Sequence, residues 1–188
     1  KHASPYMEKY VLEALFLMGY PEFGLQRMKE RFWVMVNDPE ITTLYEGWGI
    51  GKEGYGGGSV NHAWSGGGLT ILSQYLCGLS ALSPAWETIQ IKPQLGNLEF
   101  AKTSNFTIAG EVGVQVRKDK RNFIINAIIP TGSTGIVCVP DSYQIIKLNK
   151  KVIWSQQVRN SSQATFLGAK DGYNQFEVKN GKWDFVAE

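Results

Sequence analysis

The chain has 188 residues, enough for one large domain or two small ones, and its 43% hydrophobic content is that of a packed protein rather than a disordered one. Its net charge of +2 includes no basic stripe, so we expect no nucleic-acid partner. Its apolar runs are shorter than the roughly 20 residues of a membrane span, and its first residues do not form a signal peptide, so we expect no membrane partner.

The first part of the sequence has the periodicity of helices. Ser4-Pro5 places a capping residue before a proline at the first helical position, and Gly19 can end the helix that follows. A second helix begins at Pro21 and ends before Pro39, antiparallel to the first. The apolar stripes are Met7, Val11, Ala14, Leu15 and Met18 on the first helix, and Leu25, Met28, Phe32, Met35 and Val36 on the second. A third predicted helix contains Leu69, Leu72, Leu76 and Leu79 and ends at Ser83-Pro84.

These helices need a partner, because stripes this broad are not covered by three helices alone. The helices pack either on the second half of the chain or in a larger helical assembly.

A glycine-rich loop separates the second and third helices. Ten of the chain's 21 glycines lie between Gly47 and Gly68. The same stretch, with the residues just before it, carries a carboxylate, a histidine and four aromatic rings: Glu46, His62, Tyr45, Trp48, Tyr55 and Trp64. Long loops with such residues are usually functional. Rings beside a carboxylate suit carbohydrate, because the rings cover the apolar faces of a sugar and the carboxylate binds hydroxyls or water.

From Trp86 onward the period changes to two. Alternating segments occur at residues 88–92, 111–117, 123–129, 136–139, 145–148, 152–154, 164–167 and 173–178, with turn residues between them. Many short alternating strands predict an antiparallel β-sandwich. Cys77 and Cys138 lack zinc-type spacing, so we interpret them as small buried hydrophobic residues. Two histidines and two cysteines without clustering predict no metal site, and we expect no cofactor.

Four motifs in register carry a family resemblance. They are Ser4-Pro5-Tyr6-Met7, Thr42-Thr43-Leu44-Tyr45-Glu46, Asn61-His62-Ala63-Trp64-Ser65-Gly66-Gly67 and Ile91-Lys92-Pro93-Gln94. Together they resemble the C-terminal portion of a bacterial α-L-rhamnosidase of glycoside hydrolase family 78. The resemblance implies an α+β multidomain fold: residues 1–85 would be the last helices and the active-site loop of a truncated (α/α)6 barrel, and residues 86–188 a C-terminal β-sandwich.

The resemblance also implies a chemistry. The family removes terminal α-L-rhamnose with inversion, using one carboxylic acid and one carboxylate that activates water. Its general base corresponds to Glu46 and its sugar-binding histidine to His62, while the general acid has no counterpart in this chain. Tyr45 replaces the usual tryptophan and Gly68 a common proline, and neither change affects the assignment of Glu46.

Each candidate residue has a plainer interpretation. Glu46 could be a solvated loop carboxylate, with Glu53 as the alternative base, and His62 could support the loop. Trp48, Tyr55, Asn61 and Trp64 are our further substrate-binding candidates, although the tryptophans could instead anchor the loop by packing.

Three functions remain open on the sequence. The first is part of an enzyme acting on a rhamnose-containing glycoside or polysaccharide, inactive without the rest of the barrel. The second is a carbohydrate-binding sandwich, for which Trp154, Tyr173 and Trp183 are the candidate rings. The third is a structural brace whose exposed helix stripes make the isolated fragment self-associate. A periplasmic or secreted location is favoured over a cytoplasmic one.

Overall fold

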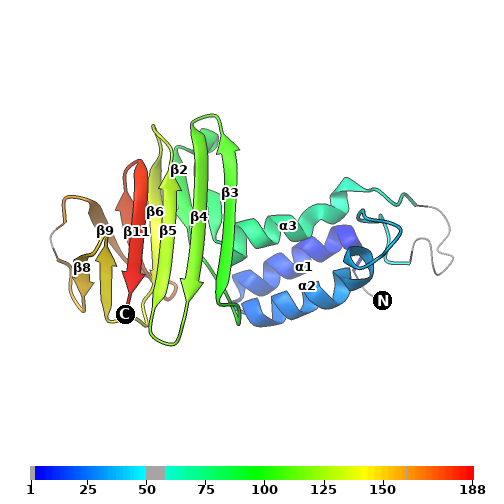
Figure 1. The fold of residues 1–188 in the computed structure, drawn as a ribbon, viewed down its shortest axis with the longest axis horizontal. Coiled ribbons are helices and arrows are strands. Elements are labelled where there is room, and N and C mark those ends of the chain that lie inside the picture. Colours follow the sequence, from blue (N-terminus) through cyan, green and yellow to red (C-terminus); the bar gives the residue numbers. More distant parts are fainter. Residues whose placement is uncertain (1–2, 50–57, 160) are drawn as a thin grey trace. The chain divides into compact units, whose positions relative to one another are not determined.

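The computed structural model describes residues 3–49, 58–159 and 161–188. The chain divides into two compact units, Lys1–Tyr75 and Leu76–Glu188. The first holds the helices and the second holds the strands (Figure 1).

The first unit begins with the predicted helix pair, α1 (Pro5–Leu17) and α2 (Pro21–Val36). The Ser4 hydroxyl accepts a hydrogen bond from the Met7 N–H at 3.3 Å, as expected of a cap. Gly19 has a φ of +80°, which lets the chain turn sharply into α2.

The buried face of α1 differs from the predicted stripe. Met7 and Met18 are exposed, whereas Glu8, Leu12 and Phe16 are buried. The reason is an ion cluster: Arg27 of α2 binds both oxygens of the Glu8 carboxylate, at 2.5 and 3.1 Å. A paired carboxylate can be buried at an acceptable free-energy cost, and hydropathy alone does not reveal the pair.

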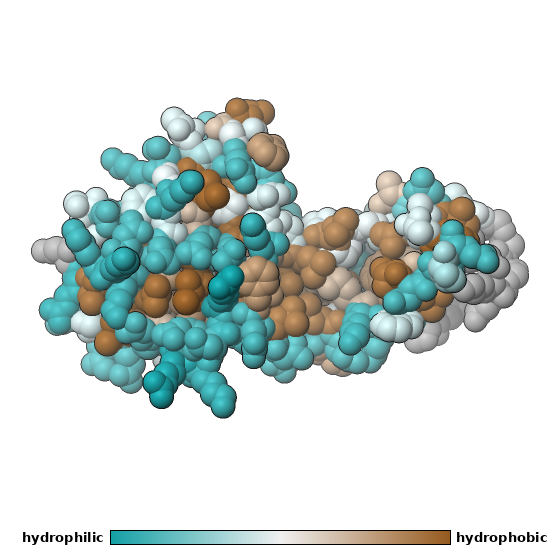
Figure 2. Space-filling model, viewed as in Figure 1, coloured by the Kyte–Doolittle hydropathy of each residue, from teal (hydrophilic) through white to brown (hydrophobic). Residues whose placement is uncertain are grey.

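Many apolar side chains of this unit remain exposed. Figure 2 shows hydrophobic residues gathered over the helices on the face in view. The exposed set on α1 and α2 includes Tyr10, Leu17, Phe23, Trp33, Val34 and Val36. A surface of this kind normally contacts another protein surface.

The third helix is shorter than predicted. A 3-10 turn (Ala63–Gly66) leads into α3 (Gly67–Ile71), and a π-helical turn (Leu72–Leu76) ends it. The sequence predicted that residues 79–81 would continue this helix. That prediction is wrong, because they form strand β1. The helix ends because Gly78 has a left-handed φ of +75°. The Gly78 carbonyl accepts a hydrogen bond from the Lys92 N–H at 2.9 Å instead of one from the helix.

The second unit is a sandwich of two sheets. One sheet has the strand order β1 (Leu79–Ala81), β2 (Thr88–Ile91), β6 (Thr134–Pro140), β10 (Tyr173–Val178) and β9 (Ala164–Lys170). The other has the order β3 (Phe100–Thr107), β4 (Gly110–Lys118), β5 (Phe123–Ile129), β11 (Gly181–Ala187), β7 (Ile145–Leu148) and β8 (Lys151–Ser155). A short 3-10 turn, Pro84–Trp86, precedes β2. The neighbouring strands pair antiparallel, except that β2 pairs parallel to β6.

The core of the sandwich follows the predicted alternation. Val112, Val114 and Val116 of β4 and Ile125 of β5 are buried, with the intervening side chains on the outer face. The predicted β-sandwich is therefore confirmed, accompanied by a few helices, although its sheets are not wholly antiparallel as predicted, because β2 pairs parallel to β6. The described residues do not contain a twelve-helix barrel. No helix among the described residues is long and apolar enough to cross a membrane.

Candidate functional site

Two segments of the glycine-rich region pair like short antiparallel strands. The Glu46 N–H donates to the Ser59 carbonyl at 3.0 Å, and the His62 N–H donates to the Leu44 carbonyl at 2.9 Å. The Thr43 hydroxyl donates a third hydrogen bond across the two segments, to the Val60 carbonyl. This register places Glu46, Ser59 and His62 together, although 13 positions separate Glu46 from Ser59.

The Glu46 carboxylate is held through one oxygen. The Ser59 N–H donates to Oε2 at 2.9 Å, and His62 Nδ1 lies 3.6 Å from the same atom. The Ser59 hydroxyl is 2.6 Å from His62 Nδ1, so Ser59 contacts both residues. Oε1 has no hydrogen bond among the residues that the structure describes, and 36% of the Glu46 side chain is exposed. The carboxylate can therefore take a proton from a water molecule through Oε1.

Exposed aromatic rings lie beside this cluster. The Trp64 ring is 4.3 Å from the His62 ring and 5.1 Å from the Tyr6 ring, measured between centroids. The Tyr6 hydroxyl is in turn 3.2 Å from the Tyr10 hydroxyl. All three aromatic residues are more than a third exposed. The arrangement offers apolar ring surface next to hydrogen-bonding groups, the combination that a sugar requires.

Trp48 makes the contacts of a loop anchor. Its indole N–H donates to the Ala3 carbonyl at 2.6 Å, and its ring packs edge-on against Phe32 at 5.2 Å. The Arg31 guanidinium lies over the ring at 4.6 Å. These contacts occupy the indole N–H, so its role in substrate binding stays a prediction.

Tyr45 supports the neighbouring Glu46 from the core. Its side chain is 1% exposed, and its carbonyl accepts the buried Ser65 hydroxyl at 2.6 Å. Burial, together with the nearby Asp38 carboxyl, raises the pKa of the Tyr45 phenol. A neutral, packed ring at this position holds the backbone of the residue that follows.

The structure gives no contact that assigns a role to the remaining predicted residues. Asn61 is exposed next to His62, whereas Tyr55 and the alternative base Glu53 lie outside the described residues. Sequence reasoning missed Ser59 and did not count Tyr6 among the site residues. No group of three or more potential metal ligands occurs among the residues with described positions.

The candidate rings of the sandwich are used internally. Trp183 donates its indole N–H to the Lys179 carbonyl at 2.8 Å, and the Tyr173 hydroxyl donates to Pro93 at 3.0 Å. Trp154 packs against Phe166 with ring centroids 4.9 Å apart. These contacts do not favour a sugar platform built from the three rings.

Fold and site together define a β-sandwich preceded by helices and by loop segments that carry a carboxylate and a histidine beside exposed rings. Residues 78–153 match the sequence profile of the bacterial alpha-L-rhamnosidase C-terminal domain. The resemblance to the C-terminal portion of a bacterial α-L-rhamnosidase is thus confirmed. No curated protein sequence matches the chain.

Solved structures agree with this result. The α-L-rhamnosidase from Dictyoglumus thermophilum is 25% identical, with a TM-score of 0.80 over 96% of this chain. A Streptomyces avermitilis α-L-rhamnosidase complexed with L-rhamnose (21% identity, TM-score 0.73, 94% of this chain) and an Aspergillus terreus α-L-rhamnosidase (18%, 0.55, 97%) share the fold. This chain covers 20%, 17% and 21% of those three chains, respectively. It therefore spans about a fifth of the length of the rhamnosidases that it resembles.

Proposed function

We propose that this chain is the C-terminal part of an inverting glycoside hydrolase that removes terminal α-L-rhamnose, and that Glu46 is its general base. The helical unit, Lys1–Tyr75, would then complete an (α/α)6 barrel with helices from the rest of the full-length protein, here called the parent enzyme. The observation that carries the proposal is the contact of Ser59 and His62 with one oxygen of the Glu46 carboxylate. The Dictyoglumus enzyme, which resembles both units, supports it.

The proposal gives each residue a part in the reaction. Glu46 Oε1 takes a proton from water while the water oxygen bonds to the anomeric carbon of rhamnose. The bond between that carbon and the leaving oxygen breaks, and a carboxylic acid elsewhere in the parent enzyme protonates the leaving oxygen. The two carboxyl groups would lie about 6.5–9.5 Å apart, which leaves room for the water.

His62 and the exposed rings would bind the sugar. The Ser59 hydroxyl engages His62 Nδ1, which leaves Nε2 of the imidazole to face a sugar hydroxyl. The Trp64 and Tyr6 rings beside it would cover an apolar face of the same sugar. Because the general acid is not in this chain, we expect the 188-residue chain alone to be inactive.

The test is hydrolysis of an aryl α-L-rhamnoside by the parent enzyme, native and carrying Glu46→Gln. We expect kcat/KM to fall by a factor on the order of 10²–10⁴, the usual contribution of a general base. Glu40→Gln, which neutralises an exposed carboxylate six positions earlier, is the matched control and should leave the rate unchanged. Circular dichroism must show that all three proteins are equally folded.

Two results would reject the assignment. An unaffected Glu46→Gln enzyme would exclude Glu46 as the base, and Glu53→Gln would be measured next. If the native parent enzyme does not hydrolyse the rhamnoside, the assignment of α-L-rhamnosides as its substrates is rejected. Inversion is checked separately by NMR, because the first product formed must then be β-L-rhamnose.

A further inference from the structure

The outer face of the six-stranded sheet contains a hollow of about 540 Å³ over β3, β4, β5 and β11. The register of these strands defines its lining. Gln115 lies opposite Lys102 on one side and Asn126 on the other, and Asn126 lies opposite Asp184. Because paired residues share a face of the sheet, these four side chains form one row across the four strands.

Gly113 lies at the floor of the hollow, between Ser104 and Ile128. A Cβ at this position would meet only ordinary contacts, the nearest at 3.5 Å, and its φ is not left-handed. The other glycines described within strands have a left-handed φ (Gly110, Gly168, Gly181) or a side-chain atom 2.8 Å from the Cβ position (Gly135).

Neither backbone geometry nor packing therefore requires glycine at position 113. A glycine inside a strand is destabilising relative to alanine, and one without a structural reason often marks a close approach by a ligand.

Three of the polar side chains that line the hollow have no hydrogen-bond partner among the described residues. The side chains of Lys102, Ser104 and Gln115 make no hydrogen bond to any residue that the structure describes, while Asn126 Nδ2 donates to Asp184 at 2.9 Å. The backbone groups of the inner strands are already used in the sheet ladder. A peptide strand pairs at a sheet edge. A ligand on this face must instead form its hydrogen bonds with side chains. This suits a molecule with hydroxyl groups around its perimeter.

The charges in the hollow balance. Lys102 and Lys182 are matched by Glu111 and Asp184, so the lining does not favour a polyanion such as nucleic acid. Ile128 adds half-buried apolar surface next to Gly113. A neutral ligand with both apolar faces and hydroxyl groups fits this lining.

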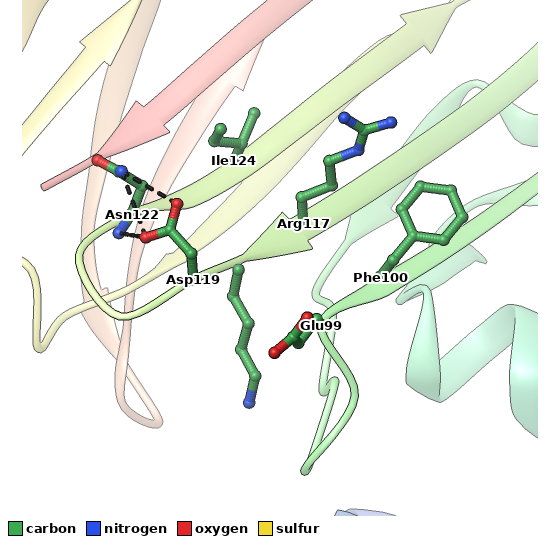
Figure 3. A pocket seen from close by; sticks show the side chains of 7 residues that line it. Glu99, Phe100, Arg117, Asp119, Asn122 and Ile124 are labelled. Atoms are coloured by element: carbon green, nitrogen blue, oxygen red, sulfur yellow. Dashed lines mark hydrogen bonds between the residues drawn. The ribbon is translucent and has the colours of Figure 1, made fainter.

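A second hollow of about 510 Å³ continues the same face along the strands (Figure 3). Phe100, Arg117 and Ile124 lie side by side there, each two positions from Lys102, Gln115 and Asn126, respectively. The Arg117 guanidinium lies over the Phe100 ring at 5.3 Å, and 48% of Phe100 is exposed. The charges again balance, with Arg117 and Lys118 against Glu99 and Asp119. Along β4 the two hollows extend over roughly 25 Å at about 3.3 Å per residue, which is longer than one monosaccharide.

We propose that this face of the sandwich is an accessory binding groove for a neutral carbohydrate chain, with Gly113 as its floor. The groove belongs to the second unit, whereas Glu46 belongs to the first, and the groove holds a polysaccharide rather than cleaving it. Only the choice of a rhamnose polymer as the first probe rests on the proposed function.

The test is native gel electrophoresis of the 188-residue chain. Separate gels contain a neutral rhamnan, the neutral polymer dextran, or the polyanion polygalacturonate. We expect rhamnan to retard the native chain, and to retard Glu46→Gln equally. Gly113→Val fills the floor and should weaken binding by about tenfold or more, with an unchanged or raised melting temperature. Gln115→Ala removes one uncommitted group without adding bulk and should also weaken binding. Thr165→Val, an exposed substitution on β9 of the other sheet, is the matched control.

Two results with the native chain would overturn the proposed groove: no retardation by any neutral polysaccharide, or retardation by polygalacturonate alone. Two results with the variants would also overturn it: a folded Gly113→Val chain retarded like the native one, or retardation lost in Glu46→Gln. The last would place binding at the loop. A parent enzyme inactive on rhamnosides would reject the proposed function, whereas these gels would still report on the groove.

Discussion

Gly78 is the residue whose replacement should most clearly destabilise the sandwich. Its φ of +75° is left-handed, and a Cβ built on it would lie 2.1 Å from the Lys92 carbonyl carbon and 2.3 Å from the Pro93 nitrogen. Both atoms belong to backbone, which cannot rotate away as a side chain can. Gly78→Ala must therefore separate the two segments and strain the hydrogen bond from the Lys92 N–H to the Gly78 carbonyl.

The magnitude follows from two terms. The left-handed conformation costs alanine about 1–2 kcal/mol, and forcing an extra methyl group into packed structure costs about 1–3 kcal/mol. The free energy of unfolding should thus fall by about 2–5 kcal/mol. At about 4 °C per kcal/mol for a domain of this size, the melting temperature should fall by roughly 8–20 °C.

The assay is thermal unfolding of the 188-residue chain, followed by the far-ultraviolet circular dichroism of its strands. Gly113→Ala is the matched control: it is the same substitution, but it should raise stability by about 0.5–1 kcal/mol because neither strain nor a clash opposes it. If Gly78→Ala melts within about 2 °C of the native chain, the close approach of the backbone at Gly78 is wrong.

Two further predictions concern the site and the core. Ser59→Ala in the parent enzyme keeps the N–H that holds Glu46 but removes the hydroxyl at His62 Nδ1, so KM should rise more than kcat falls; an unchanged KM would contradict a role for Ser59 in positioning His62. Burial raises the pKa of the Cys77 thiol to about 11 and that of Cys138 to about 12, against about 8.5 in an unfolded chain. Stability contributed by the protonated thiols should therefore be complete below about pH 8.5 and fall as the pH rises toward these values, and a thiol reagent should label both cysteines only after denaturation. Urea titrations at about pH 7 and pH 10, compared with a double cysteine-to-alanine chain, measure the effect; an equal loss in both chains would contradict it.

The strands that alternation predicted are those whose inward residues are apolar, such as Val112 to Val116 of β4. Strand β3 was missed because its alternation is inverted: Thr103 and Asn105 lie on the inner side, whereas Phe100 and Phe106 face outward. Such a strand is visible only through its pairing with β4. Strand β11 was missed as well, because its short run of Gly, Lys, Trp and Asp resembles a turn followed by a tail.

The candidate site was predictable in part for a related reason. The motifs identified Glu46 and His62, and the structure brings them to within 3.6 Å of each other. Ser59 follows a run of glycines that has no periodicity, so only the pairing of residues 43–46 with residues 59–62 reveals its role. Similarly, the buried Glu8 could not be predicted from α1 alone, because Arg27 of α2 compensates its charge.

The parallel pairing of β2 with β6 has a consequence for how the sandwich is made. The hairpin of β1 and β2 can close as soon as both strands exist, but among the described strands it joins the rest of its sheet through β6, Thr134–Pro140. Three strands of the opposite sheet are synthesised in between. At about 5–20 residues per second on a ribosome, the hairpin therefore waits for several seconds with one edge open. Contacts of such long sequence separation also slow refolding. The interval after translation of β2 is the stage at which this domain is most exposed to wrong pairing and in which a chaperone would have the most effect.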